Sequence, residues 1–261
     1  MWDDELKIAR EAAVKAGAAI MEIYEGDDFG VEYKADDSPL TKADKASNAI
    51  IVKVLRDRFP DYAILSEEEK DNKARLDNDL CFVVDPLDGT KEFVKRNGQF
   101  TVNIALSYRH RAVMGVIYIP VSGELYYASE GDGAYLEKPD GSIERLSVST
   151  NTDHSNLRAV ASGSHCAEEM ERLIEKYHIR HILRIGSSLK GCLIARGEAD
   201  LYYRNGPTME WDTAAVQCVA EEAGAIFRQG DGTVMTYNRE DTLNRKGFYI
   251  INAAQNQLRR P

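Results

Sequence analysis

The most informative stretch of the chain reads Leu80-Cys81-Phe82-Val83-Val84-Asp85-Pro86-Leu87-Asp88-Gly89-Thr90. Its apolar first half is typical of a buried β-strand, which we expect to end on the acid at Asp85. Pro86 then favours a turn, and Asp88 follows three residues after the first acid. Asp-Pro and Asp-Gly are also common turn dipeptides, so an ordinary strand-to-helix turn is the alternative interpretation.

The side chains of this turn have the chemistry of a cation site. The carboxylates of Asp85 and Asp88 and the main-chain carbonyl of Leu87 can converge on one hard cation that prefers oxygen ligands. Gly89 and Thr90 would then begin a helix whose free N–H groups and positive dipole end suit a phosphate. The stretch therefore indicates a site at which a metal ion and a phosphate meet.

Other acids of the chain also lie at predicted strand or helix ends. Glu67 and Glu68 come directly after a short strand predicted at 62–66. Asp44 and Asp212 each lie where a helix is predicted to begin. Acids also cap helix N-termini and interact well with the helix dipole, so each of these residues taken alone has a purely structural explanation.

Hydrophobic periodicity predicts a layered chain of mixed α and β structure. A three- and four-residue spacing of apolar side chains predicts a helix over 3–25, and a second helical face follows Thr41. The region from 100 to 137 favours an antiparallel meander. The strands predicted in the first half are 62–66, 80–85, 100–108, 112–119 and 124–129. The elements predicted after residue 150 are strands at 158–162 and 200–203 and helices at 166–177, 187–196 and 211–224.

Composition narrows the class of protein. The chain has 261 residues, a net charge of −10 and 43% hydrophobic residues, enough to bury a sizeable core. An acidic protein is a poor candidate for binding nucleic acid, but a small anion held by metal ions remains compatible with this charge. The acidic N-terminus lacks the features of a signal peptide, and no apolar run is long enough to span a membrane. We therefore expect a cytoplasmic protein, without excluding peripheral membrane association. Its four separated cysteines are expected to be free thiols.

The order of the acidic motifs resembles that of the inositol monophosphatase superfamily, whose members are magnesium-dependent, lithium-sensitive phosphomonoesterases. The resemblance covers nearly the whole chain and implies a layered αβαβα sandwich. The change of pattern along the chain predicts a boundary near residues 145–155 between an N-terminal α+β half, 1–150, and an α/β half, 151–261. The metal motifs fall in the first half, and the last ligand and the nucleotide contacts fall in the second. The matching residues are Asp44, Glu67-Glu68, Asp85-Pro86-Leu87-Asp88-Gly89-Thr90 and Trp211-Asp212.

This resemblance implies two or three Mg²⁺ ions. Glu67, Asp85 and the Leu87 carbonyl would hold the first ion. Asp85, Asp88 and Asp212 would hold the second, and Glu68 would support a weaker third. The catalytic residues that it implies, besides Glu68, are Thr90, which would orient the attacking water, and Asp44, which would accept the proton.

The segment from Lys91 to Leu106 resembles the 3′(2′),5′-bisphosphate nucleotidase branch, which acts in sulfate assimilation. Inositol phosphatases more usually have Thr-Asn-Phe where this chain has Lys91-Glu92-Phe93. Ser162-Gly163-Ser164-His165 resembles a nucleotide-contacting Ser-Arg-Ser-His stretch, with Gly163 in place of Arg. The loop 204–208 also matches this branch. The resemblance implies that these residues contact the substrate: Glu67, Leu87, Asp88, Gly89, Thr90, Ser162, His165, Ser188, Lys190 and Asp212.

We therefore expect a phosphatase that converts adenosine 3′,5′-bisphosphate to AMP and phosphate, with Ser188 and Lys190 near the second, non-reacting phosphate. The sulfated nucleotide 3′-phosphoadenosine 5′-phosphosulfate carries the same 3′-phosphate and is a further candidate substrate. The alternatives are an inositol or other sugar monophosphatase and a catalytically silent protein that binds Mg²⁺ and phosphate. Family members are often dimers, so the resemblance leaves a homodimer as one alternative for the oligomeric state. The last 30 or so residues, after Gly230, carry no recognisable motif.

Overall fold

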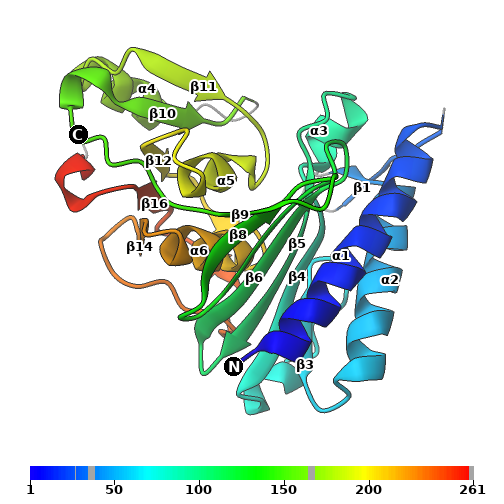
Figure 1. Cartoon of the computed structure of the whole chain (residues 1–261). Helices are drawn as coiled ribbons and strands as arrows, with labels where there is room; N and C mark the ends of the chain where they lie inside the picture. The colour runs from blue at the N-terminus through cyan, green and yellow to red at the C-terminus, as the bar shows by residue number, and fades with distance from the viewer. Residues whose placement is uncertain (27, 35–38, 164–167, 259–261) are drawn as a thin grey trace.

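The computed structural model describes residues 1–26, 28–34, 39–163 and 168–258, and its helices and sheets alternate in layers (Figure 1). Helices α1 (Asp3–Tyr24) and α2 (Lys42–Arg58) lie side by side and form the first layer. The buried stripe of α1 consists mostly of alanine, which lets the helix approach the sheet and α2 closely. Both helices agree with the predicted spans.

The second layer is a seven-stranded sheet with the order β3-β4-β5-β6-β7-β8-β9. Strands β3 and β4 run parallel, and every other neighbouring pair is antiparallel, as the predicted meander requires. The bounds are β3 Ala63–Ser66, β4 Leu80–Asp88, β5 Thr101–Tyr108, β6 Arg111–Ile119, β7 Glu124–Ser129, β8 Gly133–Glu137 and β9 Ile143–Arg145.

Helices α5 (Leu189–Ala195) and α6 (Ala214–Glu222) form a middle layer between the two sheets (Figure 1). Helix α6 packs on β5, β6 and β7 on one side and on β14 on the other. The second sheet has the order β11-β10-β12-β16-β14, with β10, β11 and β12 parallel and β16 antiparallel to both of its neighbours. Its strands are β10 Arg158–Ala161, β11 His181–Arg184, β12 Leu201–Arg204, β14 Ile226–Gln229 and β16 Phe248–Ile251.

Helix α4 (Glu168–Lys176) covers the outer face of this sheet, where its Leu173 and Ile174 join a buried cluster with strand residues. The predicted αβαβα arrangement is therefore confirmed. The remaining elements are short: β1 Glu32–Tyr33, β2 Pro39–Leu40, α3 Thr90–Val94, β13 Thr208–Met209, β15 Leu243–Asn244, and 3₁₀ turns at Ala74–Asp77, His154–Asn156 and Ala254–Asn256.

Two predicted boundaries near the acids were wrong. Strand β4 does not end at Asp85 but continues to Asp88, because the backbone keeps its pairing with β5 across an irregularity between these two residues. Helix α6 begins at Ala214 and not at Trp211, so Asp212 lies in the turn before the helix.

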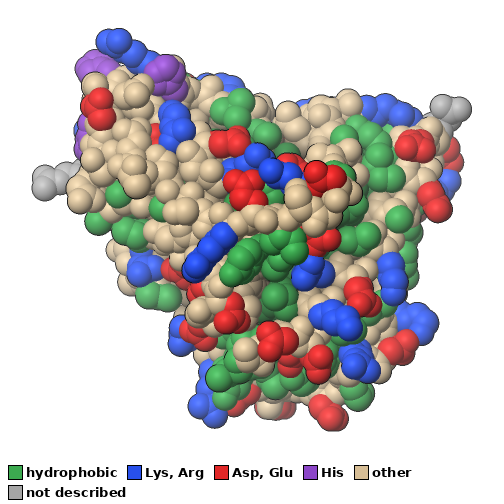
Figure 2. All heavy atoms as spheres, in the orientation of Figure 1, with side chains coloured by type: hydrophobic (Ala, Val, Ile, Leu, Met, Phe, Trp, Pro, Cys, Tyr) green, Lys and Arg blue, Asp and Glu red, His purple; other side chains and the backbone are tan. Residues whose placement is uncertain are grey.

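The largest apolar core draws on both halves of the chain, from Leu65 in β3 to Ile250 in β16. The boundary at 145–155 stays a prediction. Cys81, Cys192 and Cys218 are buried free thiols, and Cys166 lies outside the described residues. Across the described chain no helix is long and apolar enough to cross a membrane. Acidic and basic side chains are interspersed over the face in Figure 2, and those drawn in colour form no continuous basic stripe.

Candidate active site

Three carboxylates meet where β4 ends beside the turn before α6. One oxygen each from Asp85, Asp88 and Asp212 lie within 4.8 Å of one another. An irregularity in the pairing of β4 with β5 produces this arrangement. Asp85 pairs with Asn103 and Asp88 pairs with Thr101, so β4 has one residue more than β5 over this stretch. Extra residues in one strand of a ladder re-aim side chains in this way and are common next to active sites.

Hydrogen bonds hold each of these carboxylates through one oxygen. Oδ1 of Asp85 accepts from the backbone amide of Leu87 at 3.1 Å. Oδ2 of Asp88 accepts from the Ser188 amide at 2.6 Å and the Ser188 hydroxyl at 2.8 Å, with Asn103 Nδ2 at 3.3 Å. Oδ2 of Asp212 accepts from the amide of Met209 at 2.6 Å. The carboxylates are thereby fixed in place before any ligand arrives.

The electrostatics of this cluster favour a cation. Asp85 is only 1% exposed, and burial, reinforced by the charges of Glu67, Asp88 and Asp212, raises its pKa well above the ordinary value. Burial and then the charge of Asp88 raise the pKa of Asp212 to about 8. Like-charged buried carboxylates repel one another, and a hard divalent cation with oxygen ligands removes that repulsion. The donor set therefore fits Mg²⁺.

The two glutamates after β3 share a cationic partner that sequence reasoning missed. Lys34 Nζ donates to Glu67 Oε1 at 2.7 Å and to Glu68 Oε1 at 2.6 Å. Burial alone would lower the pKa of Lys34, but the two carboxylates outweigh it and raise that pKa. No local pattern marks Lys34, because its partners lie more than thirty residues away along the chain.

The predicted pair Asp44 and Thr90 is brought together. Thr90 Oγ1 lies 3.1 Å from Asp44 Oδ1 and 3.2 Å from the carbonyl oxygen of Leu87, so its single proton serves two acceptors. Asp44 Oδ2 accepts from the backbone amide of Thr41 at 2.7 Å and from its hydroxyl at 2.6 Å in a capping box that begins α2. Burial raises the pKa of Asp44.

A cavity of about 570 Å³ lies over the acids and is lined by residues from both halves of the chain. Ser162, Lys190, Tyr202 and Arg204 line it on the side of the second sheet. Burial lowers the pKa of Lys190 to about 8, and its Nζ donates to the Ser187 carbonyl at 2.6 Å.

The other predicted substrate residues are distributed as follows. Glu67, Leu87, Asp88, Gly89, Thr90, Ser188 and Asp212 line the same cavity. Gly89 needs to be glycine, because its φ is +95° and a Cβ would lie 2.9 Å from the Gln99 carbonyl oxygen. His165 lies outside the described residues, so its placement stays a prediction.

Residues at the end of the chain also support the site, although no motif was predicted there. Leu243 lines the cavity, and β15 pairs with β13 directly before Asp212. The polar run Tyr237-Asn238-Arg239-Glu240-Asp241 was the available signal. Its partners could not be inferred, because they come from distant segments.

The layered sandwich and its clustered acids define a class of protein, and residues 1–259 match the inositol monophosphatase family. The chain belongs to this family. It is 42% identical over 243 residues to the 3′(2′),5′-bisphosphate nucleotidase CysQ of Salmonella typhimurium, covering 92% of this chain and 96% of the relative. It is 40% identical over 252 residues to CysQ of Escherichia coli, covering 96% and 99%.

Solved structures agree with this assignment. The crystal structure of CysQ from Bacteroides thetaiotaomicron, a bacterial member of the inositol monophosphatase family, superposes with a TM-score of 0.83 at 42% identity, covering 96% of this chain and 98% of that one. The inositol monophosphatase of Thermotoga maritima superposes with a TM-score of 0.79 at 26% identity, covering 95% and 92%.

Proposed function

We propose that this protein is a Mg²⁺-dependent 3′(2′),5′-bisphosphate nucleotidase that removes the 3′-phosphate of adenosine 3′,5′-bisphosphate, giving AMP and phosphate. The observation that carries the proposal is the group of three carboxylates that line one cavity, the buried Asp85 and the half-buried Asp88 and Asp212. The CysQ relatives, similar over nearly their whole length, favour the nucleotide over other phosphate esters.

Two or three Mg²⁺ ions would be held by the acids around this floor. Asp85, Asp88 and Asp212 would hold one of them, and Asp85 with Glu67 and the Leu87 carbonyl another. Glu68 would support a third. Bound Mg²⁺ would neutralise the charge on the phosphoryl oxygens and lower the pKa of a bound water. Glu67 and Glu68 would first have to exchange the ammonium group of Lys34 for the metal.

Thr90 and Asp44 would prepare the nucleophile. The Thr90 hydroxyl, held between Asp44 and the Leu87 carbonyl, would orient a water molecule for in-line attack on the phosphorus. Asp44 has a raised pKa, which suits a carboxylate that must accept a proton. Its own orientation is set by Thr41 and does not depend on substrate.

The walls from the second half would bind the rest of the nucleotide. Lys190 and Arg204 line the cavity beyond the acids and supply positive charge for the second, non-reacting phosphate. Ser162 lies on the same wall, and we expect His165 to join it. A 3′-phosphoadenosine 5′-phosphosulfate molecule presents the same reacting group and would be a further substrate.

Phosphate release from a panel of esters tests the proposal. We expect kcat/KM for adenosine 3′,5′-bisphosphate to exceed that for inositol 1-phosphate, and activity to vanish when Mg²⁺ is chelated. Asp85→Asn should lower kcat by about a thousandfold or more, since it removes a shared metal ligand. Asp140→Asn, which changes an exposed carboxylate in the β8–β9 turn, is the matched control and should stay fully active.

Three outcomes would contradict the proposal. A preference for inositol 1-phosphate would make the protein a sugar monophosphatase. A folded, inert protein under saturating Mg²⁺ with every ester would favour a silent binding protein. Normal activity in Asp85→Asn would remove the metal assignment.

A further inference from the structure

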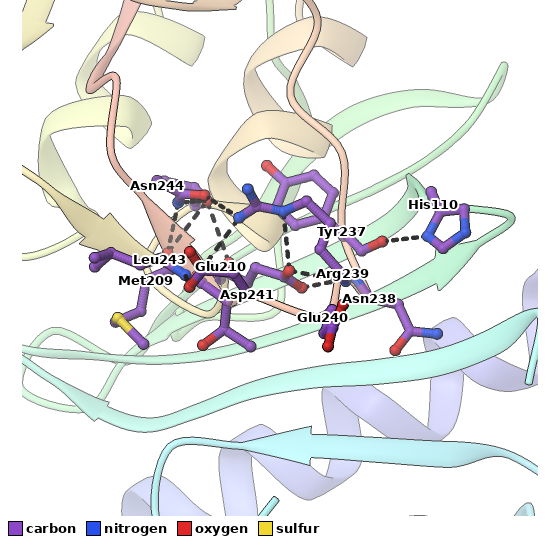
Figure 3. Close-up of polar contacts among 12 residues, drawn as sticks. His110, Met209, Glu210, Tyr237, Asn238, Arg239, Glu240, Asp241, Leu243 and Asn244 are labelled. Atoms are coloured by element: carbon purple, nitrogen blue, oxygen red, sulfur yellow. Dashed lines mark hydrogen bonds and ion pairs between the residues drawn. The ribbon is translucent and has the colours of Figure 1, made fainter. Parts of the chain in front are cut away.

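The end of the chain forms a polar network around Glu210, two residues before Asp212 (Figure 3). The Glu210 carboxylate is 0% exposed. It accepts hydrogen bonds from the Asn238 amide at 2.6 Å, the Arg239 amide at 3.0 Å and Arg239 Nε at 3.1 Å. A buried carboxylate with this many donors is held in one orientation.

A second set of contacts links this network to Asp212 itself. Asn244 Nδ2 donates to the Met209 carbonyl oxygen at 2.8 Å, and Arg239 Nη2 donates to Asn244 Oδ1 at 2.5 Å. The amide of the same Met209 donates to Asp212 Oδ2 at 2.6 Å. The N–H group of Met209 thus holds the Asp212 carboxylate, while its carbonyl group is held by Asn244 of the C-terminal segment.

The same segment is also joined to the first half of the chain. Arg75 Nη1 donates to Asn238 Oδ1 at 2.8 Å, and Asn238 Nδ2 donates to the carbonyl oxygens of Arg75 and Asn78, each at 3.0 Å. Arg75 and Asn78 precede β4, the strand that carries Asp85 and Asp88. One segment thus ties the Asp212 turn to the approach of the strand that supplies the other two acids.

We propose that Glu210 is a positioning residue for Asp212, which it acts on through Arg239 and Asn238. It holds the turn from Thr208 to Asp212 at the distance from β4 that a shared cation requires. Groups that orient metal ligands commonly change metal affinity about 10- to 100-fold when they are removed. This inference deepens the proposed function and rests on Asp212 being a metal ligand.

A purely structural role makes a different prediction, and the chain offers a matched control. Asp200 is also 0% exposed, and it accepts from the Arg158 amide at 2.8 Å, Arg158 Nη2 at 2.6 Å and Asn151 Nδ2 at 2.8 Å. It has the same kind of partners as Glu210 but makes none of the contacts around Asp212. Loss of the hydrogen bonds of either carboxylate should destabilise the folded protein, whereas only loss of those to Glu210 should change the metal site.

The test is calorimetric titration of the full-length protein with Mg²⁺ alone, together with steady-state kinetics at varied Mg²⁺. We expect Glu210→Gln to raise the Kd for Mg²⁺ by about tenfold or more, and its kcat to recover towards the wild-type value at saturating Mg²⁺. Asp200→Asn should lower the Tm and leave the Kd for Mg²⁺ unchanged. Arg239→Gln should reproduce the Glu210→Gln effect and serves if that variant does not fold, since Arg239 is partly exposed.

A wild-type Kd in folded Glu210→Gln, or in Arg239→Gln if only that variant folds, would overturn the inference. An equal rise of Kd in Asp200→Asn would do the same, because it would make the effect one of general stability. The variant Asp212→Asn distinguishes a failure of this inference about Glu210 from a failure of the proposed function. If Asp212→Asn also binds Mg²⁺ with wild-type Kd, the metal assignment itself is wrong.

Discussion

At the scale of single residues, the site brings like-charged acids close together. Asp85, Asp88 and Asp212 lie within 4.8 Å of one another at one oxygen each, and burial raises the pKa of Asp85 and Asp212. The metal-free protein therefore binds protons where the loaded protein would bind Mg²⁺. Metal binding and proton release must be linked.

This linkage makes a prediction for Asp212, whose pKa in the folded, metal-free chain is about 8. A carboxyl with a raised pKa stabilises the metal-free fold fully below its ordinary pKa of 3.8, and that contribution is lost as the pH rises through about 8. Mg²⁺ affinity should therefore increase between pH 6 and pH 8, by up to about tenfold per pH unit for each proton displaced.

Titration calorimetry in buffers of different ionisation enthalpy measures the protons released. We expect release of up to about one proton each from Asp212 and Asp85 at pH 7. A Kd that is constant from pH 6 to pH 8, with no proton release at pH 7, would contradict the link. Asp212→Asn is the control and should release fewer protons.

Sequence reasoning selected the acids because each lies close to a predicted strand or helix end, and such ends are visible as local patterns. It could not find Lys34 or Glu210. Lys34 bonds two glutamates far along the chain, and the partners of Glu210 are 28 and 29 residues away in sequence. Such pairings depend on how the sheets pack, which periodicity does not report.

At the scale of elements, helix α6 sets the position of Asp212. It lies close on β6 because residue 115 is glycine. A Cβ built there would approach the backbone carbonyl oxygen of Ala215 to 2.4 Å, far inside van der Waals contact. The contact is with helix backbone, so a flexible side chain cannot relieve it.

We therefore predict that Gly115→Ala moves α6 outward. The expected cost is about 1–3 kcal/mol in the free energy of unfolding, typical of overpacking, with a weaker affinity for Mg²⁺ because Asp212 moves with the helix. Denaturant unfolding and calorimetry measure the two effects. Gly163→Ala, whose Cβ would have no atom of the described residues within 4 Å, is the control for the unfolding free energy. Wild-type stability in Gly115→Ala would show that the helix position does not depend on this contact.

The elements themselves were largely predictable, and the errors have a physical cause. Long amphipathic helices and the antiparallel meander have strong local patterns. Strand β4 extends past Asp85. Pro86 does not end the strand, because it lies within the register irregularity between Asp85 and Asp88. The start of α6 was placed too early, because Trp211 and Asp212 have the apolar and acidic character of a first helical turn.

At the scale of the whole molecule, the two halves share one core. Helix α6 and strand β16 belong to the second half, yet Ala215 and Ile250 lie in the same buried cluster as Leu65 and Val83 of the first. Without α6, the large sheet would expose one apolar face to water.

We predict that residues 1–150 and 151–261, expressed separately, do not fold independently. Each should lack cooperative unfolding, because the surface that the other covers is apolar. Circular dichroism and thermal denaturation of each fragment, with the full-length chain as control, check this. Cooperative unfolding of the isolated 1–150 fragment would contradict the prediction and would support a true domain boundary near 145–155.

The shared cavity has a consequence for how such a protein diversifies. Its floor of acids comes mainly from β4, while Lys190, Tyr202 and Arg204 on the far wall come from the second half. Mutations in that wall can alter which alcohol is accepted without disturbing the hydrolytic apparatus. Library design confined to the codons of this wall, with Asp212 kept, would therefore explore new esters while the acids of the metal site are inherited unchanged.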